Sequence, residues 1–417
     1  MNEAALAALS VVIFGWAILS GWFARHNLTG PLVFMVAGLV LANSSWGIGS
    51  IDVEGSTVHG MAEITLALLL FGDASVVRPA AARHDLSLTT RLLAIGLPLS
   101  IVAGAALAVL VFPSLPLAVA GLIAASLAPT DAALSASVIA DERLPARVRR
   151  VLNVESGLND GIATPVVTFC IAAAATALGV VGSDFEHGFG ALGQLLVGAA
   201  VGAAVAFVGG RLIAFAHQRG WMQSGPRQLA TLALALLAFL VASEAGGNPF
   251  VSAFVGGFVF GWSARDDAVE AVELTELGGN LLSLALWFIF GAAFVIPAFE
   301  DLDARIVIYA VVSLTVVRMV PVALALIGTR QGRATVAFVG WFGPRGLASV
   351  VFALLAIEEL GGTDPRVMVA VNTIAVTIVF SVIAHGITAR PLATRYLSGL
   401  NSTQRASVDV PASESDR

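Results

Sequence analysis

The sequence predicts an all-α membrane protein, and three observations support this. Hydrophobic residues make up 58% of the chain and charged residues only 12%, whereas a soluble domain carries about 25% charged residues. Apolar runs recur at about 20 residues, the length a helix needs to cross a bilayer. The runs are continuous rather than alternating, which favours helices over a β-barrel.

The apolar runs predict thirteen membrane spans within one unit that covers residues 1–400. Their ranges are 4–24, 29–43, 57–77, 90–112, 116–140, 147–178, 190–216, 228–245, 249–264, 274–297, 305–328, 334–357 and 366–389. The first run has no basic segment or small-residue cleavage site beside it, so we interpret it as a retained span. The polar residues 401–417 are expected to be a disordered cytoplasmic tail.

The basic residues predict the orientation. All 22 of them are arginine. Arg318 and Arg345 fall inside spans, and Arg305 and Arg366 fall in loops on one side of the membrane. Every other arginine falls on the opposite side, which the positive-inside rule makes cytoplasmic. We therefore expect the N-terminus outside and the C-terminus in the cytoplasm.

Five charged residues lie well inside apolar spans: Asp131, Glu155, Asp160, Arg318 and Arg345. A charge at bilayer depth costs about 2.5–3.5 kcal/mol, so these groups must pair with one another or face water. Three are negative and two are positive. One bound monovalent cation, or one proton, would neutralise the cluster.

The segment 120–140 contains the first predicted helix break. Pro129 lacks a backbone donor and disfavours helix at Ala128. A break there frees carbonyls to coordinate a cation beside Asp131. The alternative is a Pro-kinked helix in which Asp131 is bonded to a neighbour.

The segment 150–167 carries the densest polar patch. Glu155 and Asn159 share a helix face, Asp160 is rotated by about 100° from Asn159, and Ser156 shares the face of Asp160. The alternative to an ion site is polar bonding between helices.

A second break is predicted within 339–355, where Gly343, Pro344 and Gly346 surround Arg345. The two broken spans are fifth in spans 1–6 and fifth in spans 8–13, and matched interruptions are typical of inverted-repeat transporters. Arg345 then either offsets the partial negative charge at the carbonyl ends of the half-helices or simply neutralises the acidic side chains. Both readings remain open.

Arg318 is expected to pair with Glu155, which finds no other cation nearby in the sequence. Such a pair would be a structural strut rather than the transport site. Glu63, Asp73 and His385 also lie in spans, but the sequence assigns them no role.

The motifs resemble those of the monovalent cation:proton antiporters, in the sodium/proton exchanger branch with an Asn-Asp pair. The resemblance rests on APTDAALSASVIADERLPARVRRVLNVESGLNDG at 128–161, LLLFGDAS at 68–75, VRMVPVA at 317–323 and WFGPRGLASVVFAL at 341–354. It extends over about residues 5–392. Ala132 departs from the pattern, since many members have proline there, and this leaves Pro129 alone to shape the break.

The resemblance implies a fold of thirteen helices in two inverted repeats with two broken, crossing helices. It implies a dimerisation bundle (1–85 and 225–300), a core or transport bundle (88–180 and 303–392), a homodimer and elevator-like transport. It implies Asp160 as the carrier of cation and proton. It implies three further cation or proton ligands in Asp131, Ser156 and Asn159, and a fourth in the backbone of Thr130. It implies that Glu155 and Arg318 form a buried ion pair. It implies that Arg345 supplies the compensating charge at the break.

The expected function is exchange of a monovalent cation (Na⁺ first, then Li⁺ or K⁺) for H⁺ across the cell membrane. Asn159 in place of a second acid implies electroneutral exchange. No enzyme activity, cofactor or nucleic-acid partner is expected. The alternatives are a cation channel or a K⁺/H⁺ efflux system that uses the same acids. An organic-anion carrier fits the net negative cluster less well, and a membrane sensor is not expected because no signalling domain is recognised after the thirteenth span.

Overall fold

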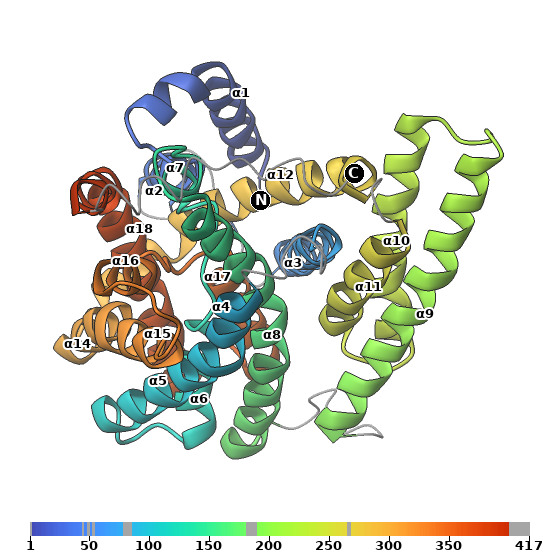
Figure 1. Cartoon of the computed structure of the whole chain (residues 1–417). Helices are drawn as coiled ribbons and strands as arrows, with labels where there is room; N and C mark the ends of the chain where they lie inside the picture. The colour runs from blue at the N-terminus through green and yellow to red at the C-terminus, as the bar shows by residue number, and fades with distance from the viewer. Residues whose placement is uncertain are drawn as a thin grey trace.

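The structure, a computed structural model, describes residues 2–43, 46–47, 51, 55–77, 86–180, 190–264 and 268–399. The predicted tail at 401–417 lies outside the described residues, as do Arg78, Arg83 and Arg265 of the orientation argument. Within the described ranges the chain forms helices and their connections (Figure 1).

Nine helical segments of the described chain are long and apolar enough to cross a membrane. Seven are single helices: α1 (Glu3–Arg25), α3 (Ser56–Ser75), α8 (Ala146–Leu178), α9 (Gly190–Gln218), α10 (Ser224–Glu244), α12 (Ala268–Ala293) and α18 (Pro365–Gly399). Two contain a π-helical turn: α4 (Leu86–Arg91), η1 (Leu92–Gly96) and α5 (Leu97–Val111) form one, and α14 (Ala304–Val312), η4 (Ser313–Val317) and α15 (Arg318–Ala325) form the other.

The remaining helices are shorter. They are α2 (Gly30–Leu41), α6 (Leu117–Ser126), α7 (Ala136–Ile139), α11 (Pro249–Ala264), α13 (Val295–Glu300), α16 (Arg333–Trp341) and α17 (Leu347–Leu360). Each of the thirteen predicted ranges overlaps one or more of the long and short helices given above. The all-helical membrane class is thus confirmed, while the number of thirteen crossings stays a prediction.

The helix contacts form two sets. In one set, α11 packs against α9 and α3, and α12 packs against α2 and α3. In the other, α5 packs against α6, α6 against α8, and α14 against α18. Helix α3 lies near the centre of the molecule (Figure 1), where it also contacts α8 and α17 and so joins the two sets.

Glycines allow the backbones of α2 and α12 to lie in direct contact. A methyl group at Gly38 would collide with the carbonyl of Phe288, and one at Gly291 with the carbonyl of Met35. Small residues at helix contacts are the usual basis of close packing in membranes. This contact therefore holds α2 and α12 together as one rigid unit.

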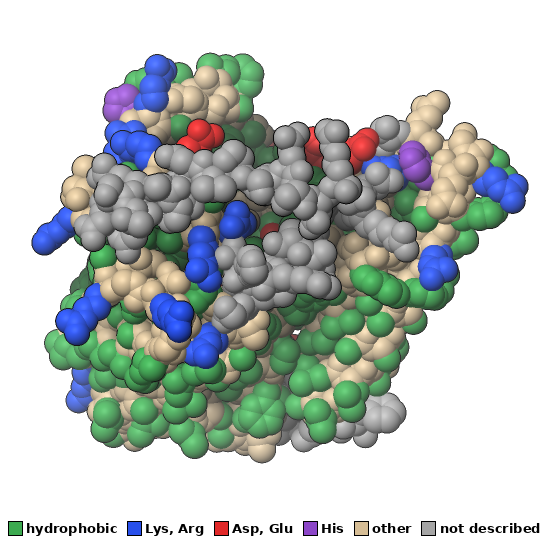
Figure 2. Space-filling view, in the orientation of Figure 1, with side chains coloured by type: hydrophobic (Ala, Val, Ile, Leu, Met, Phe, Trp, Pro, Cys, Tyr) green, Lys and Arg blue, Asp and Glu red, His purple; other side chains and the backbone are tan. Residues whose placement is uncertain are grey.

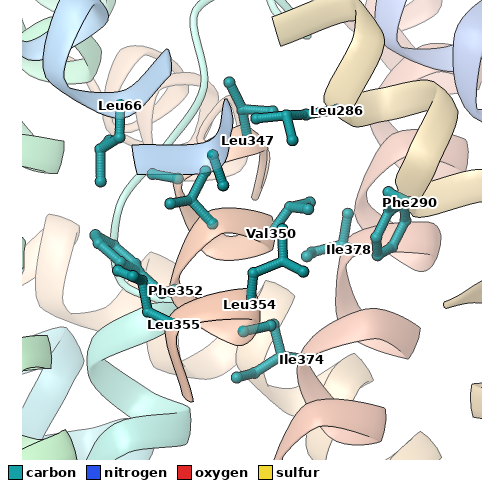
Figure 3. Packing of buried hydrophobic residues seen from close by; sticks show 14 of the residues in the cluster. Leu66, Leu286, Phe290, Leu347, Val350, Phe352, Leu354, Leu355, Ile374 and Ile378 are labelled. Carbon is teal, nitrogen blue, oxygen red and sulfur yellow. The ribbon is translucent and has the colours of Figure 1, made fainter. Parts of the chain in front are cut away.

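Helix α17 is buried from Leu347 to Ala356, and only its last turn, around Glu358, reaches the surface. Its hydrophobic side chains are buried among those of α3, α12 and α18 (Figure 3); the labelled members of this cluster are Leu66, Leu286, Phe290, Leu347, Val350, Phe352, Leu354, Leu355, Ile374 and Ile378. A helix that is apolar all round is a buried helix.

Two spans are interrupted at the predicted positions. Helix α6 ends at Ser126 and the chain resumes helix only at Ala136, with Pro129 in the gap. Helix α16 ends at Trp341 and α17 begins at Leu347, with Pro344 in that gap. The missing proline donor ends each helix.

We expect Gly38→Ala to destabilise the protein by about 1–3 kcal/mol, because the added methyl has no space against a backbone carbonyl. The measurement is the thermal unfolding midpoint in detergent. Gly15→Ala in α1 is the matched control, since nothing lies within 4 Å of the position of its added methyl. Equal midpoints for the two variants would contradict the close-packing argument.

Candidate functional site

The two helix breaks contact each other through main-chain hydrogen bonds. The amide of Asp131 donates to the carbonyl of Pro344 at 2.8 Å, and the amide of Leu347 donates to Oδ2 of Asp131 at 3.0 Å. One turn into α17, the Ser349 hydroxyl donates to the carbonyl of Ser126 at 2.6 Å. The breaks therefore satisfy each other's freed backbone groups, which a low-dielectric setting requires.

The charges at the breaks match the partial charges of the half-helix ends. Asp131 lies at the N-terminus of α17, where amide hydrogens gather, and its Oδ1 also accepts from the amide of Ala133 at 2.7 Å. Arg345 donates to the carbonyl of Ala128 at 2.6 Å, just beyond the C-terminus of α6. Anions favour helix N-termini and cations favour C-termini. The Arg345 guanidinium thus lies against the carbonyl end of α6.

The polar face of helix α8 contacts the first break at Thr130. The Ser156 hydroxyl donates to the carbonyl of Thr130 at 2.5 Å. Asn159 donates from Nδ2 to the hydroxyl oxygen of Thr130 at 2.6 Å. The structure thus brings Thr130, Ser156 and Asn159 together, and the Thr130 carbonyl keeps one lone pair for a further partner.

Asp160 has a buried oxygen without a hydrogen-bond partner. Its Oδ1 is inaccessible to solvent, and no described residue donates to it; the same holds for Oδ1 of Asn159. A buried acceptor left unpaired costs about 1–3 kcal/mol, and more when it is charged. A proton or a cation on Asp160 would remove this cost.

Asp160 borders a cavity of about 420 Å³ that also contacts Thr130, Asp131 and Ser156. The cavity extends to Val76 at the end of α3 and to Arg150 near the start of α8. These helix ends adjoin the predicted arginine-rich side, and Figure 2 shows arginine side chains gathered on the face turned to the viewer. Asp160 is therefore reached from one side of the molecule.

Asp73 has no role assigned from the sequence, yet the structure places it in this cavity. It projects from α3 towards α8, where a methyl group on Gly157 would lie 3.4 Å from its Cβ. Its position near the end of a span is typical of an interfacial residue. Only the packing of α3 against α8 brings it to Asp160, and no local sequence signal reports that contact.

Glu155 and Arg318 form a bidentate ion pair that does not line the cavity. Arg318 donates from Nη1 to Oε1 of Glu155 at 2.7 Å and from Nη2 to Oε2 at 2.9 Å. Both side chains are 3% exposed. The guanidinium occupies the space that a side chain at Gly343 would need, so the pair lies directly against the second break.

His385 and Glu63 do not border the cavity. The ring of His385 lies between two carbonyl oxygens, those of Ser381 and Trp341, each at 2.8 Å, and so joins α18 to the end of α16. Glu63 lies on α3, two turns and more from Asp73 towards the opposite end of the helix. Among the described residues, no three His, Cys, Asp or Glu side chains are arranged as metal ligands, so a cation here would also need hydroxyl, amide or carbonyl oxygens.

Two interrupted helices that cross, beside a carboxylate in a cavity at membrane depth, define a membrane transporter of the broken-helix class. The chain matches the sodium/hydrogen exchanger transmembrane family over residues 9–395. It belongs to this family, which is one of transporters rather than enzymes.

Curated relatives and solved structures agree with the family. The chain is 26% identical to the K⁺/H⁺ antiporter NhaP of Alkalimonas amylolytica over 87% of this chain and 61% of the relative. It is 26% identical to a sodium, potassium, lithium and rubidium/H⁺ antiporter of Bacillus subtilis over 67% of this chain and 41% of the relative. A probable Na⁺/H⁺ antiporter of Schizosaccharomyces pombe shares 24% identity over 57% of this chain and 33% of the relative. This chain thus spans less than two thirds of the length of each of these relatives.

The fold is similar to that of the sodium proton antiporter MjNhaP1 from Methanocaldococcus jannaschii. The TM-score is 0.74 at 20% sequence identity, and the match covers 94% of this chain and 98% of the other. At this identity the comparison shows the fold alone.

We expect Glu155→Gln to destabilise the protein by about 3–5 kcal/mol, because it leaves Arg318 buried without its carboxylate. Thermal unfolding and folded yield in detergent measure the effect. Glu155→Gln combined with Arg318→Met should recover much of the loss, since no charge is then buried. Asp364→Asn, which removes an exposed partner of Arg366, is the control and should change little. Unaltered stability of Glu155→Gln would contradict the role of the pair as a strut.

Proposed function

We propose that this chain is a secondary antiporter that exchanges a monovalent cation for H⁺, with Asp160 as the group that carries either one. The observation that supports this most directly is the buried, unpartnered Oδ1 of Asp160 beside the cavity. A carboxylate there can be satisfied by a proton or by a cation. Since each occupant excludes the other, loading depends on the pH and cation concentration of the side that the cavity faces.

The ligands we propose for the cation are oxygens of Asp160, Asp131, Thr130 and Ser156, with Asn159 beside them. Oxygen atoms suit Na⁺, Li⁺ and K⁺, and several lie together here: the carbonyl of Thr130, the hydroxyl of Ser156 and Oδ1 of Asn159. Asp131 is held by two amide donors, at Ala133 and Leu347, which leave lone pairs free on its carboxylate. It can therefore contribute an oxygen from a fixed position.

Charge balance supports one-for-one exchange. Glu155 and Arg318 cancel, and Arg345 offsets Asp131 at the crossed breaks. Within the five-charge cluster this leaves the single negative charge of Asp160. One cation and one proton neutralise it equally, so each crossing would move the same net charge.

We further propose elevator-like transport by a core that moves against a dimerising scaffold. The proposal is supported by the two sets of helix contacts, which meet at α3 through its contacts with α8 and α17. Inverted repeats are supported by two pairs of irregular spans. The breaks occupy the fifth and twelfth predicted spans, and the π turns η1 and η4 occupy the fourth and eleventh. We also propose a homodimer in the cell membrane with the arginine-rich side in the cytoplasm.

K⁺/H⁺ exchange at the same site is the second candidate, favoured by the name of the relative from Alkalimonas amylolytica. A channel is less favoured. The residues around the cavity belong to the arginine-rich half, and beyond Leu347 helix α17 is enclosed by hydrophobic side chains (Figure 3). A channel would need a continuous polar path through that region.

We expect Asp160→Asn to abolish cation-driven proton movement, because the amide can neither carry the proton nor supply the charge. The purified protein in liposomes with an internal pH dye, given Na⁺, Li⁺ and K⁺ in turn, is the measurement. Asp364→Asn, an acid outside the site, is the matched control and should exchange normally. Normal exchange by Asp160→Asn would refute the proposed carrier. Cation-driven flux without proton counterflow in the unmodified protein would support a channel.

The elevator proposal is tested at a contact between the two bundles. His59 of α3 and Glu358 near the end of α17 lie 3.3 Å apart between Nδ1 and Oε2, far from the cavity. His59→Cys with Glu358→Cys, in a Cys170→Ala background and joined by a short bis-methanethiosulfonate reagent through a disulfide at each cysteine, should stop exchange, because the link ties the core to the scaffold. Reduction should restore exchange, and each single cysteine variant serves as the control. Full exchange with the link intact would contradict movement at this contact.

A further inference from the structure

A second cavity lies at the arginine-rich end of the molecule, apart from the ion site. Its volume is about 500 Å³. It is bounded by the last part of α1, the start of α2, the short helix α7 and α18 (Figure 1). It shares one lining residue with the first cavity, Ala133, whose amide holds Asp131; its other lining residues have no part in the proposed transport mechanism.

The outer end of this cavity is basic. Arg143 and Arg390 both line it, and Arg390 donates from Nη2 to the carbonyl of Arg25, the last residue of α1. Asp141 pairs with Arg143 at 2.8 Å, but no carboxylate of the described residues pairs with Arg25 or Arg390. Arg143 and Arg390 therefore face one acid, so the charged residues that line the cavity leave one excess positive charge.

The inner end of the cavity is apolar. Trp16 lies nine residues before Arg25 on α1, so it is about 14 Å deeper along the helix axis. Ala133, Ala136 and Ala140 line the opposite wall around α7. With helix ends at one side and Trp16 at the other, the cavity runs from headgroup depth into acyl-chain depth.

We propose that this cavity binds an anionic phospholipid. The phosphate would lie between Arg390 and Arg143, beside the start of α2, where helix amides favour an anion, and the upper acyl chain would lie along Trp16 and the alanines around α7. Basic pockets between membrane helices suit anionic headgroups. A soluble anion would use the arginines alone and leave the apolar depth unfilled. The bound lipid would contact α1 and α2 on one side and α7 and α18 on the other, so it would bridge elements of the two sets of helix contacts.

The test is native mass spectrometry of the full-length protein in detergent, titrated with dioleoylphosphatidylglycerol or dioleoylphosphatidylcholine. We expect saturable binding of the anionic lipid that is at least several-fold tighter than binding of the zwitterionic one. Arg390→Gln should weaken it roughly fivefold, the effect of one basic residue at a membrane surface. Ala136→Phe keeps the charges but fills the apolar part, and should weaken it as well.

Arg211→Gln is the matched control, because Arg211 lies on α9 towards the same end, over the ring of Phe207, and does not line the cavity. It should bind as the unmodified protein does. Thermal unfolding without added lipid establishes that each variant is folded; an unfolded Arg390→Gln is replaced by Arg143→Gln. Equal binding of the two lipids, or equal effects of Arg390→Gln and Arg211→Gln, would overturn the proposal in favour of a non-specific lipid annulus. Displacement of the lipid by equimolar glycerol 3-phosphate would overturn it in favour of a soluble anion.

Discussion

The crossing of the two broken helices is the contact on which the rest of the structure depends. Asp131 accepts the amide of Leu347 at one half-helix end, and Arg345 donates to the carbonyl of Ala128 at another. Without this exchange, backbone groups freed by Pro129 and Pro344 would be buried and unpaired. Because the breaks satisfy each other, the chain can keep non-helical backbone, and hence the Thr130 carbonyl, at membrane depth.

The same crossing divides the buried charges into those that hold the fold and those that remain available. Glu155, Arg318, Arg345 and Asp131 all have fixed partners at short distance. Asp160 differs, since no described residue donates to its buried oxygen. The structural charges thus surround and position one chemically unsatisfied carboxylate, which is what a site that alternates between two occupants needs.

The sequence predicted both the breaks and the groups around them, because proline, glycine and charge at membrane depth each have a strong local cost. The Glu155–Arg318 contact followed from the same reasoning, as each ion needed a partner. Asp73 was not predicted, since its place in the cavity depends on how α3 packs against α8. The hydrogen bonds that backbone amides donate to Asp131, and the cavity at α7, likewise depend on three-dimensional packing that residue spacing does not encode.

The dry packing around α17 has an electrical consequence. The cavity beside Asp160 extends to helix ends on the arginine-rich side, and water filling it would bring the potential at this carboxylate close to that of the adjacent compartment. The membrane voltage then falls almost entirely across the hydrophobic layer of α17 and its neighbours (Figure 3). A charge crossing that thin layer experiences the full field, about 2.3 kcal/mol for each elementary charge and 100 mV. In this arrangement an ion binds at Asp160 with almost no dependence on voltage.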